Sequence, residues 1–516
     1  MFGWVRENSA FGGHGTARSR STRPTAPASE LSTREDRTVT DTTRESEIRD
    51  PEAEATAAFD ATALVASTRW AFDERITQPL EWRYEQLEAL ATMLRDHADR
   101  FTAELGSDLG KSPTEVWTTE IGFSLNDIEH QRKHLADWAK PRKVRTPLTF
   151  RPGRSRIVPE PKGVTLVMAP WNYPLELLVA PMAAAIAAGN AVVAKPSELA
   201  PATSAALVEL CGRYLDDRTI KVVAGGVEES TALLEQRFDH IFFTGGTRVG
   251  KIVMRAAAEH LTPVTLELGG KSPAIVAADA DIEVTARRLV WGKFTNAGQT
   301  CVAPDYVLVE RTVRDRLLDE MVSTITEFYG DDPKQSADYG RIVNVGHHDR
   351  LTELLRDDRS GRHHVGGAVD ADARYIAPTV LVDPDPSARI MQEEIFGPLL
   401  PVIAVDSIAE AVDFVVERPK PLALYVFSRD DDTVATVVDQ TSSGGAGINN
   451  TLLHIGPPEL PFGGIGASGM GAYHGQTGFD TFSHLRSVYE RKLRPDPPLL
   501  YPPFTDLKQR ILRMFT

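Results

Sequence analysis

The fold of this chain is decided by residues 163–198, which read GVTLVMAPWNYPLELLVAPMAAAIAAGNAVVAKPSE. Gly163–Met168 is a short apolar run, which predicts a buried β-strand. A helix from about Leu175 to Ala188 follows, and Ala191–Ala194 predicts a second buried strand. A strand, a crossover helix and another strand form the unit from which parallel, doubly wound sheets are built.

The same alternation of strand and helix runs along most of the chain. A helix from Thr203 to Tyr214 comes next, and further short strands are predicted at 221–224, 241–243, 274–276, 379–382, 400–403 and 424–427. These strands form one series before Gly269 and a second series after it. We therefore predict an α/β fold with two doubly wound domains.

The segments outside these two series have other patterns. Residues 1–55 are rich in Ser, Thr, Arg, Asp and Glu and poor in large apolar residues, which predicts a disordered extension. Leu87, Leu90 and Leu94 recur with the spacing of one helix face. Residues 142–160 have the alternating pattern of extended strands.

The composition excludes several classes of function. The 516 residues carry a formal net charge of −15, whereas nucleic-acid binding needs a basic face. Two cysteines cannot form a disulfide framework, so we expect a reducing compartment and a cytoplasmic protein. No apolar run has the length of a transmembrane helix, and we expect no membrane span.

Two segments carry side chains suited to covalent catalysis. Asn296–Cys301 (NAGQTC) places a thiol beside Gly, Gln and Asn residues, which are typical of a loop that presents a side chain. A thiolate is a strong nucleophile, although a buried, inert cysteine is the alternative. Upstream, Glu267–Pro273 (ELGGKSP) offers a carboxylate that can act as a base.

Further candidate segments follow predicted strands, at the edge where open α/β sheets bind ligands. Phe243–Lys251 (FTGGTRVGK) has glycines before a helix, which favour a phosphate, but it lacks the G-x-G-x-x-G fingerprint, and a tight turn is the alternative. Lys195–Glu198 suits ribose hydroxyl groups or a solvated turn. Asn172 can donate to an oxyanion or cap a helix.

Taken together, these motifs resemble the NAD(P)-dependent aldehyde dehydrogenases. The resemblance runs from about residue 60 to the C-terminus and leaves out the first 55 residues or so. Arg237–Gly245, Pro461–Gly471 and Tyr473–Gly475 are most similar to the class 3 branch and to bacterial coniferyl-aldehyde-type enzymes. The resemblance implies oxidation of an aldehyde to its carboxylic acid.

The resemblance also implies roles for single residues. Cys301 matches the nucleophile that forms a thiohemiacetal and then a thioester. Asn172 matches the oxyanion donor, and Glu267 matches the base that activates water for hydrolysis of the thioester. The cofactor is NAD or NADP, and no metal is implied. Its matching residues are Trp171, Lys195, Glu198, Gly245, Gly250, Glu394 and Phe396.

Two features bear on the choice of cofactor. The charge of Glu198 repels a 2′-phosphate, which favours NAD. Position 246 is Gly where relatives often carry Ser or Asn, so a side-chain contact to phosphate is in doubt. The class 3 branch accepts both cofactors, and the preference therefore stays open.

Composition, the two series of strands and the family likeness together divide the chain into regions, and the family likeness also predicts a homo-oligomer, a dimer before a tetramer. The regions are 1–55 as a disordered extension, 56–268 as the cofactor-binding domain with oligomerisation strands at 142–160, 269–450 as the catalytic domain, 451–494 as a return segment that lines the pocket and forms an oligomerisation arm, and 495–516 as a proline-rich tail with a short amphipathic helix.

The sequence leaves the substrate open between aromatic and medium-chain aliphatic aldehydes. Candidate pocket residues are Tyr173, Trp291, Phe294 and Phe462, although aromatic side chains beside apolar strands more often serve packing. For the tail helix, which Thr505 can cap, we expect packing on the subunit or its partner rather than on a membrane surface.

Three alternatives remain at this stage. A dehydrogenase that transfers the acyl group to coenzyme A or phosphate would lack the base at Glu267. A structural or binding protein that kept the fold but lost the chemistry would not need the intact set of Cys301, Asn172, Glu267 and Glu394. A thiol hydrolase would need a histidine partner for the thiol, and no histidine motif indicates one.

Overall fold

The first domain is built on a six-stranded sheet with the order β17-β7-β6-β3-β4-β5. The computed structural model describes residues 59–514, so the extension predicted for residues 1–55 lies outside the described residues. Five strands are parallel, and β17 runs antiparallel to β7. The strands are β3 (Val164–Met168), β4 (Ala191–Lys195), β5 (Ile220–Val222), β6 (His240–Thr244), β7 (Val264–Glu267) and β17 (Gly469–Met470).

Both faces of this sheet are covered, because the strands carry apolar side chains on both sides. Leu166 and Val193 face one layer of helices, whereas Val167 and Phe242 face the other. The first layer contains α1 (Ala61–Asp73), α8 (Val227–Leu234) and α9 (Thr247–Glu259). The second layer contains α6 (Glu176–Ala188) and α7 (Pro201–Tyr214).

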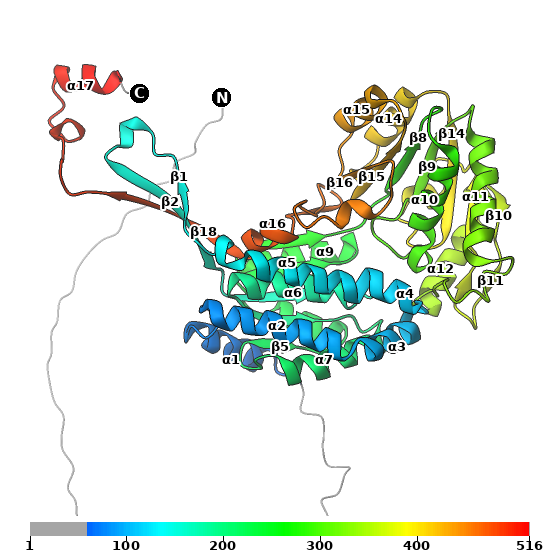
Figure 1. Cartoon of the computed structure of the whole chain (residues 1–516), viewed down its shortest axis with the longest axis horizontal. Coiled ribbons are helices and arrows are strands. Elements are labelled where there is room, and N and C mark those ends of the chain that lie inside the picture. Colours follow the sequence, from blue (N-terminus) through cyan, green and yellow to red (C-terminus); the bar gives the residue numbers. More distant parts are fainter. Residues whose placement is uncertain (1–58, 515–516) are drawn as a thin grey trace, which may run out of the picture. The chain divides into compact units, whose positions relative to one another are not determined.

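Further helices pack on the outside of α6 and α7 (Figure 1). On α2 the predicted face of Leu87, Leu90 and Leu94 is fully buried. These helices are α2 (Leu80–Asp96), α3 (Ala98–Leu109), α5 (Gly122–Trp138) and α16 (Gly475–Thr481), and α3 is joined to α5 by the short α4 (Pro113–Val116) and the π-helical turn η1 (Trp117–Ile121).

The second domain contains a seven-stranded sheet with the order β10-β13-β14-β9-β8-β15-β16. Only β10 is antiparallel to its neighbour. The strands are β8 (Pro273–Val276), β9 (Tyr306–Glu310), β10 (Arg362–Val365), β13 (Thr379–Val382), β14 (Leu399–Val405), β15 (Ala423–Phe427) and β16 (Gly445–Ile448). The prediction of two doubly wound domains is confirmed.

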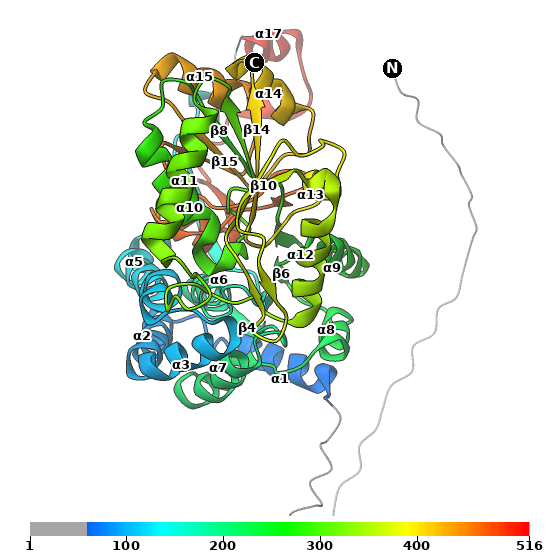
Figure 2. The same ribbon diagram turned by 90° about the vertical axis from the view of Figure 1, so that its right-hand side faces the viewer.

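Helices cover this second sheet as well (Figure 2). In that view α10 (Ile282–Phe294) and α11 (Arg314–Tyr329) lie together on one side of the strands. The other helices are α12 (Val345–Arg356), α13 (Arg389–Gln392), α14 (Ile408–Val416) and α15 (Asp431–Gln440), and a small hairpin is formed by β11 (Val369–Asp370) and β12 (Tyr375–Ile376). The boundary predicted between 268 and 269 falls in the connection from β7 to β8, and the exact domain limits stay a prediction.

A third, three-stranded antiparallel sheet extends away from the two domains (Figure 1). It joins β1 (Arg142–Val144) and β2 (Gly153–Pro161) to β18 (Ser483–Arg491). β18 pairs with β2 along its whole length, from Ser483 opposite Pro161 to Arg491 opposite Gly153. The extended segments predicted at 142–160 and near 480–492 therefore belong to one sheet.

The tail ends in the short helix α17 (Asp506–Arg513), which Thr505 caps by accepting a hydrogen bond from the N–H of Lys508. No residue of α17 is buried. Packing of α17 on its own subunit or on a partner stays a prediction. Between residues 59 and 514, no helix is both long and apolar enough to cross a membrane.

Phe242 provides a test of how the C-terminal return stabilises the first domain. Its fully buried ring meets Tyr473 at 5.0 Å and stacks on Phe482 at 5.8 Å. Phe242→Ala should lower the free energy of unfolding by about 3–5 kcal/mol, because it leaves a cavity. Val227→Ala, at a position 76% exposed, should change it by less than about 0.5 kcal/mol. Equal urea midpoints for the two variants would contradict this account.

Candidate active site

The Cys301 loop follows α10 and is held in an unusual conformation. Asn296 and Ala297 have positive φ angles of 53° and 49°, a region in which a non-glycine residue costs about 1–3 kcal/mol. Gln299 fixes the loop, since its side chain donates to the carbonyls of Asn296 and Arg341 and accepts from the N–H of Val343. Backbone strain held in this way is typical of functional sites.

Cys301 lines a largely apolar cavity of about 290 Å³, here called the Cys301 cavity. Three predicted pocket residues, Tyr173, Trp291 and Phe462, line it too. Its wall combines segments that are distant in the sequence: 118–123, 173–177, 291–302, 452–462 and 473–474. One of these segments contains the π-helical turn η1, an irregularity that is frequent at functional sites.

Phe294 does not line this cavity, contrary to the prediction. The side chain is 1% exposed and belongs to the hydrophobic core of the second domain. The reason is its place at the last residue of α10, where its ring packs inward, whereas Trp291 on the same helix is 38% exposed.

Asn172 lies in the connection from β3 to α6, four residues after the end of β3, and is 2% exposed. Its Nδ2 donates a hydrogen bond to the carbonyl oxygen of Gln299, 3.0 Å away, which brings the Asn172 amide against the Cys301 loop. The amide nitrogen has a second hydrogen that remains for a ligand. The backbone carbonyl oxygen of Asn172 accepts hydrogen bonds from Asn296 Nδ2, at 2.8 Å, and from Lys111 Nζ, at 2.9 Å.

Lys111 and Glu120 form a buried ion pair with an Nζ–Oε1 distance of 2.5 Å. The other carboxylate oxygen of Glu120 accepts hydrogen bonds from the N–H groups of Leu175 and Glu176. The pair thereby fixes the start of α6 and the Asn172 segment. Neither Lys111 nor Glu120 was predicted from the sequence as a residue of the site.

Glu267 ends β7 with a carboxyl group that is almost fully buried. Neither of its carboxylate oxygens has a hydrogen-bond partner among the described residues. Burial raises the pKa of Glu267 well above its usual value. Burial, together with the nearby carboxyl groups of Glu394, Glu267 and Glu176, also raises the pKa of the Cys301 thiol. The carboxyl groups of Glu394, Glu267 and Glu176 therefore all lie close enough to Cys301 to disfavour its thiolate.

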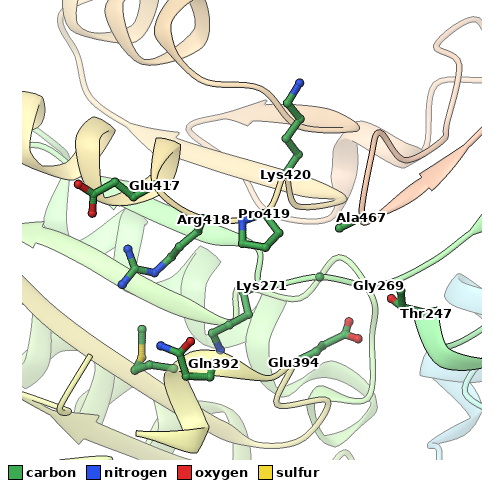
Figure 3. Close-up of a pocket in the computed structure, with 12 residues that line it drawn as sticks. Thr247, Gly269, Lys271, Gln392, Glu394, Glu417, Arg418, Pro419, Lys420 and Ala467 are labelled. Carbon is green, nitrogen blue, oxygen red and sulfur yellow. The ribbon is translucent and has the colours of Figure 1, made fainter. Parts of the chain in front are cut away.

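Glu394 lines a second cavity of about 400 Å³, here called the Glu394 cavity. Figure 3 shows the Glu394 carboxyl group near Gly269, with Thr247 and Lys271 at other parts of the wall. A Cβ on Gly269 would lie 2.1 Å from a Glu394 oxygen, so the glycine permits this close approach. Burial, followed by the charge of Asp305, raises the pKa of Glu394 to about 8.

Two further contacts hold the segment around Glu394. Lys271 Nζ bonds to Asp305 at 2.5 Å and donates to the carbonyl of Glu393 at 3.1 Å. The ring of Phe396 meets that of Trp171 edge to face, with ring centres 5.3 Å apart. Trp171 and Phe396, two of the predicted cofactor residues, are thus brought together from different domains.

The other predicted cofactor residues lie at the carboxyl ends of β4 and β6. Lys195 is buried, and its Nζ bonds to the exposed carboxylate of Glu198 at 3.1 Å. Gly245 lies in the turn after β6, and its N–H donates to the carbonyl of Glu267. Gly250 lies within α9, where a Cβ would come 2.7 Å from a methyl carbon of Leu268. Gly250 therefore permits close packing of α9.

The start of α9 is suited to an anion. Its N-cap is Gly246, which has no side chain to bond the first N–H groups of the helix. Thr247, the first residue of α9, lines the Glu394 cavity. Free N–H groups and the helix dipole favour a phosphate at such a position.

The whole chain was compared with known proteins. The aldehyde dehydrogenase family matches residues 32–488. The chain belongs to the aldehyde dehydrogenase family. The match begins at residue 32, so the predicted start of the resemblance near residue 60 was too late.

Similar members of the aldehyde dehydrogenase family come from animals and bacteria. The dimeric NADP-preferring aldehyde dehydrogenase of Mus musculus is 48% identical, over 86% of this chain and 97% of the relative. The 4,4′-diaponeurosporen-aldehyde dehydrogenase of Staphylococcus aureus is 47% identical, over 84% and 94%. The substrate-bound structure of Staphylococcus aureus AldH has a TM-score of 0.86 at 44% identity, over 89% of this chain and 100% of that one.

Several residues of this aldehyde dehydrogenase site were not found from the sequence. Glu176, Tyr473 and His474 line the Cys301 cavity. Glu176 has a visible signal, because it is the single charged residue in an otherwise apolar helix. Tyr473 and His474 lie in the segment 451–494, which is predicted to line the pocket, although neither residue is predicted individually. The two aromatic residues reach the cavity through long-range packing, which has no local pattern.

Glu267→Gln should stabilise this aldehyde dehydrogenase, and by more as the pH rises. In the unfolded chain Glu267 loses its proton near pH 4.3, whereas its pKa in the folded protein is raised. Between the two pKa values, wild-type stability therefore falls by about 1.4 kcal/mol per pH unit, and the Gln variant avoids this loss. Urea unfolding of both proteins at about pH 6 and about pH 8 measures the difference.

The matched control for this measurement is Glu228→Gln, at an exposed position of α8. Its effect should be small at both pH values. A Glu267→Gln effect that is equal at both pH values would show that burial does not penalise the charged carboxylate.

Proposed function

We propose that this protein oxidises an apolar aldehyde to the carboxylic acid, with NAD or NADP as the hydride acceptor. The observation that carries the proposal is the position of Cys301. Cys301 lines the Cys301 cavity, and after burial the charges of Glu394, which lines the other cavity, and of Glu267 raise the pKa of its thiol. A nucleophile between an apolar cavity and a polar one is what the reaction requires.

The residues of the Glu394 cavity fit a dinucleotide. Glu394 has a buried oxygen without a partner in the described chain, which a ribose hydroxyl can satisfy. The uncapped start of α9 would hold the pyrophosphate, and Lys195 with Glu198 would hold the adenosine ribose. When bound, the nicotinamide group supplies the hydride acceptor. A relative with an NADP preference supports both cofactors as candidates.

The first chemical step falls to Cys301 and Asn172. The thiolate form of Cys301 attacks the aldehyde carbon, a C–S bond forms as the C=O π bond breaks, and the carbonyl oxygen becomes an oxyanion. Asn172 donates its free amide hydrogen to that oxyanion, together with the backbone N–H of Cys301. Lys111 and Asn296 hold the backbone carbonyl of Asn172 by hydrogen bonds, so the side-chain amide of Asn172 is positioned before the reaction begins.

Glu267 acts in the second step, which begins once the hydride has left the substrate carbon. The raised pKa of this carboxyl group makes its ionised form a stronger base than an ordinary carboxylate. It takes a proton from water as the water oxygen attacks the Cys301 thioester. The C–S bond breaks, the carboxylic acid leaves with the Cys301 thiolate restored, and Glu267 then releases its proton.

The wall of the Cys301 cavity supports an apolar aldehyde, either aromatic or medium-chain aliphatic. Trp291, Leu453 and Ile455 are among its apolar lining residues. The name of the Staphylococcus aureus relative, a 4,4′-diaponeurosporen-aldehyde dehydrogenase, supports a hydrocarbon-like substrate as well.

Paired kinetics of Cys301→Ala and Glu267→Gln test the mechanism. Cys301→Ala should abolish reduction of the cofactor, because no thioester can form, while cofactor binding is retained. Glu267→Gln should give a burst of reduced cofactor of about one per active site and then a steady state slowed by ~10²–10⁴. Stopped-flow absorbance of the reduced nicotinamide follows both phases.

The outcomes separate the rival functions. Turnover by Cys301→Ala would remove the proposed nucleophile. Equal loss of burst and steady state in Glu267→Gln would remove its role in hydrolysis. Absence of turnover in the wild type with every aldehyde tested would favour a structural or binding protein that kept the fold.

We also propose a homodimer formed through the sheet of β1, β2 and β18. Support comes from β18, an end strand whose other edge has no strand partner between residues 59 and 514, and from the mouse relative, which is named dimeric. Light scattering should give about twice the monomer mass of 56.6 kDa. Leu485→Glu, at a half-exposed position of β18, should shift the mass toward the monomer, and Val227→Glu on α8 should not.

A further inference from the structure

Glu176 is an acidic side chain in the wall of the Cys301 cavity that the proposed mechanism does not use. It is the first residue of α6, and the remaining residues of that helix are apolar. The side chain lines the cavity together with Cys301, and the residue is only 8% exposed. Between residues 59 and 514, no hydrogen bond reaches its carboxyl group.

The surroundings of Glu176 favour the neutral form of its carboxyl group over the charged one. Glu120 in η1 and Asp127 in α5 are acidic neighbours, and Lys111 is already paired with Glu120. Burial first, and then the negative charges of Glu120 and Asp127, raise the pKa of Glu176 well above its usual value. A neutral carboxyl group both donates and accepts a hydrogen bond.

The hydroxyl groups of Tyr173 and of the threonines in the cavity wall are already hydrogen-bonded. Tyr173 and Thr300 bond to each other at 2.6 Å. Those of Thr118, Thr119 and Thr295 donate to backbone carbonyls of their own helices. Glu176 therefore has hydrogen-bonding capacity that these residues lack.

Tyr473 also lines the cavity, and between residues 59 and 514 no hydrogen bond reaches its hydroxyl group. His474 is a further lining side chain with unused capacity. Its Nε2 is buried and has no partner in the described chain. Burial lowers the pKa of His474 to about 4, and its ring stacks on Phe462 at 5.4 Å. It is therefore the natural comparison for Glu176 in a test.

We propose that Glu176 forms a polar subsite in the Cys301 cavity and selects aldehydes that carry a hydroxyl group remote from the carbonyl carbon. The apolar wall takes the hydrocarbon part, and the hydroxyl both donates to and accepts from the carboxyl of Glu176. An unsubstituted aldehyde that fills the cavity removes water from this carboxyl group without replacing its hydrogen bonds, which is unfavourable. This inference rests on the proposed oxidation of aldehydes.

The test compares ω-hydroxyalkanals with alkanals of the same length, from butanal to octanal, with benzaldehyde and hydroxybenzaldehydes as an aromatic arm. In the wild type, kcat/KM should be higher for the hydroxylated member at one or more lengths. Glu176→Leu should lower this ratio about tenfold, while Glu176→Gln, which keeps a donor and an acceptor, should retain most of it. Thr118→Val and His474→Phe are the controls and should leave the ratio unchanged.

Several results would overturn the subsite. These are a wild-type ratio of one or less for every pair, a ratio unchanged in a folded Glu176→Leu, or a preference that His474→Phe removes. A stronger preference for an ω-trimethylammonio alkanal would show that Glu176 acts as an anion instead. Turnover without a hydroxyl preference overturns this inference alone, whereas no turnover with any aldehyde overturns the proposed function as well. Thermal unfolding confirms that each variant is folded.

Discussion

The buried ion pair of Lys111 and Glu120 is the interaction on which the candidate active site depends. Both side chains are fully removed from water, which costs several kcal/mol for each ion. Hydrogen bonds offset that cost, because Glu120 accepts from the N–H groups of Leu175 and Glu176 and Lys111 donates to the carbonyl of Asn172. The same bonds connect the N-terminal helices to the start of α6 and to the Asn172 amide.

The site also contains features that lower stability. Glu267 and one oxygen of Glu394 are buried without partners in the described chain, and Asn296 and Ala297 have strained backbone angles. Each costs free energy in the absence of ligands. The two parallel sheets tolerate these costs because their strands are buried on both faces and hold the strand ends in place. A reactive thiol with buried carboxyl groups beside it is therefore presented by rigid elements.

The sequence predicts those parts of this structure that have a local pattern. Val164–Met168 and Ala191–Lys195 are fully buried strands, so their continuous apolar runs are visible in one sequence. The ion pair was not predictable, because Lys111 reaches Asn172 across a fold that no periodicity describes. The same limit explains Phe294, since the direction of a ring at a helix end depends on the tertiary packing around it.

The loop that carries the reactive Cys301 and the wall that contacts the aldehyde are held in place by different parts of the fold. The Cys301 loop is clamped from within the second domain, through the bonds of Gln299 to Arg341 and Val343. The cavity wall instead combines η1, α6 and the 452–462 segment, which meet only in the folded chain. Changes in the wall can leave the clamped loop intact, so a resemblance to relatives indicates the reaction more reliably than the aldehyde. In a wall this apolar, the few polar groups with unused hydrogen-bonding capacity decide which aldehydes fit.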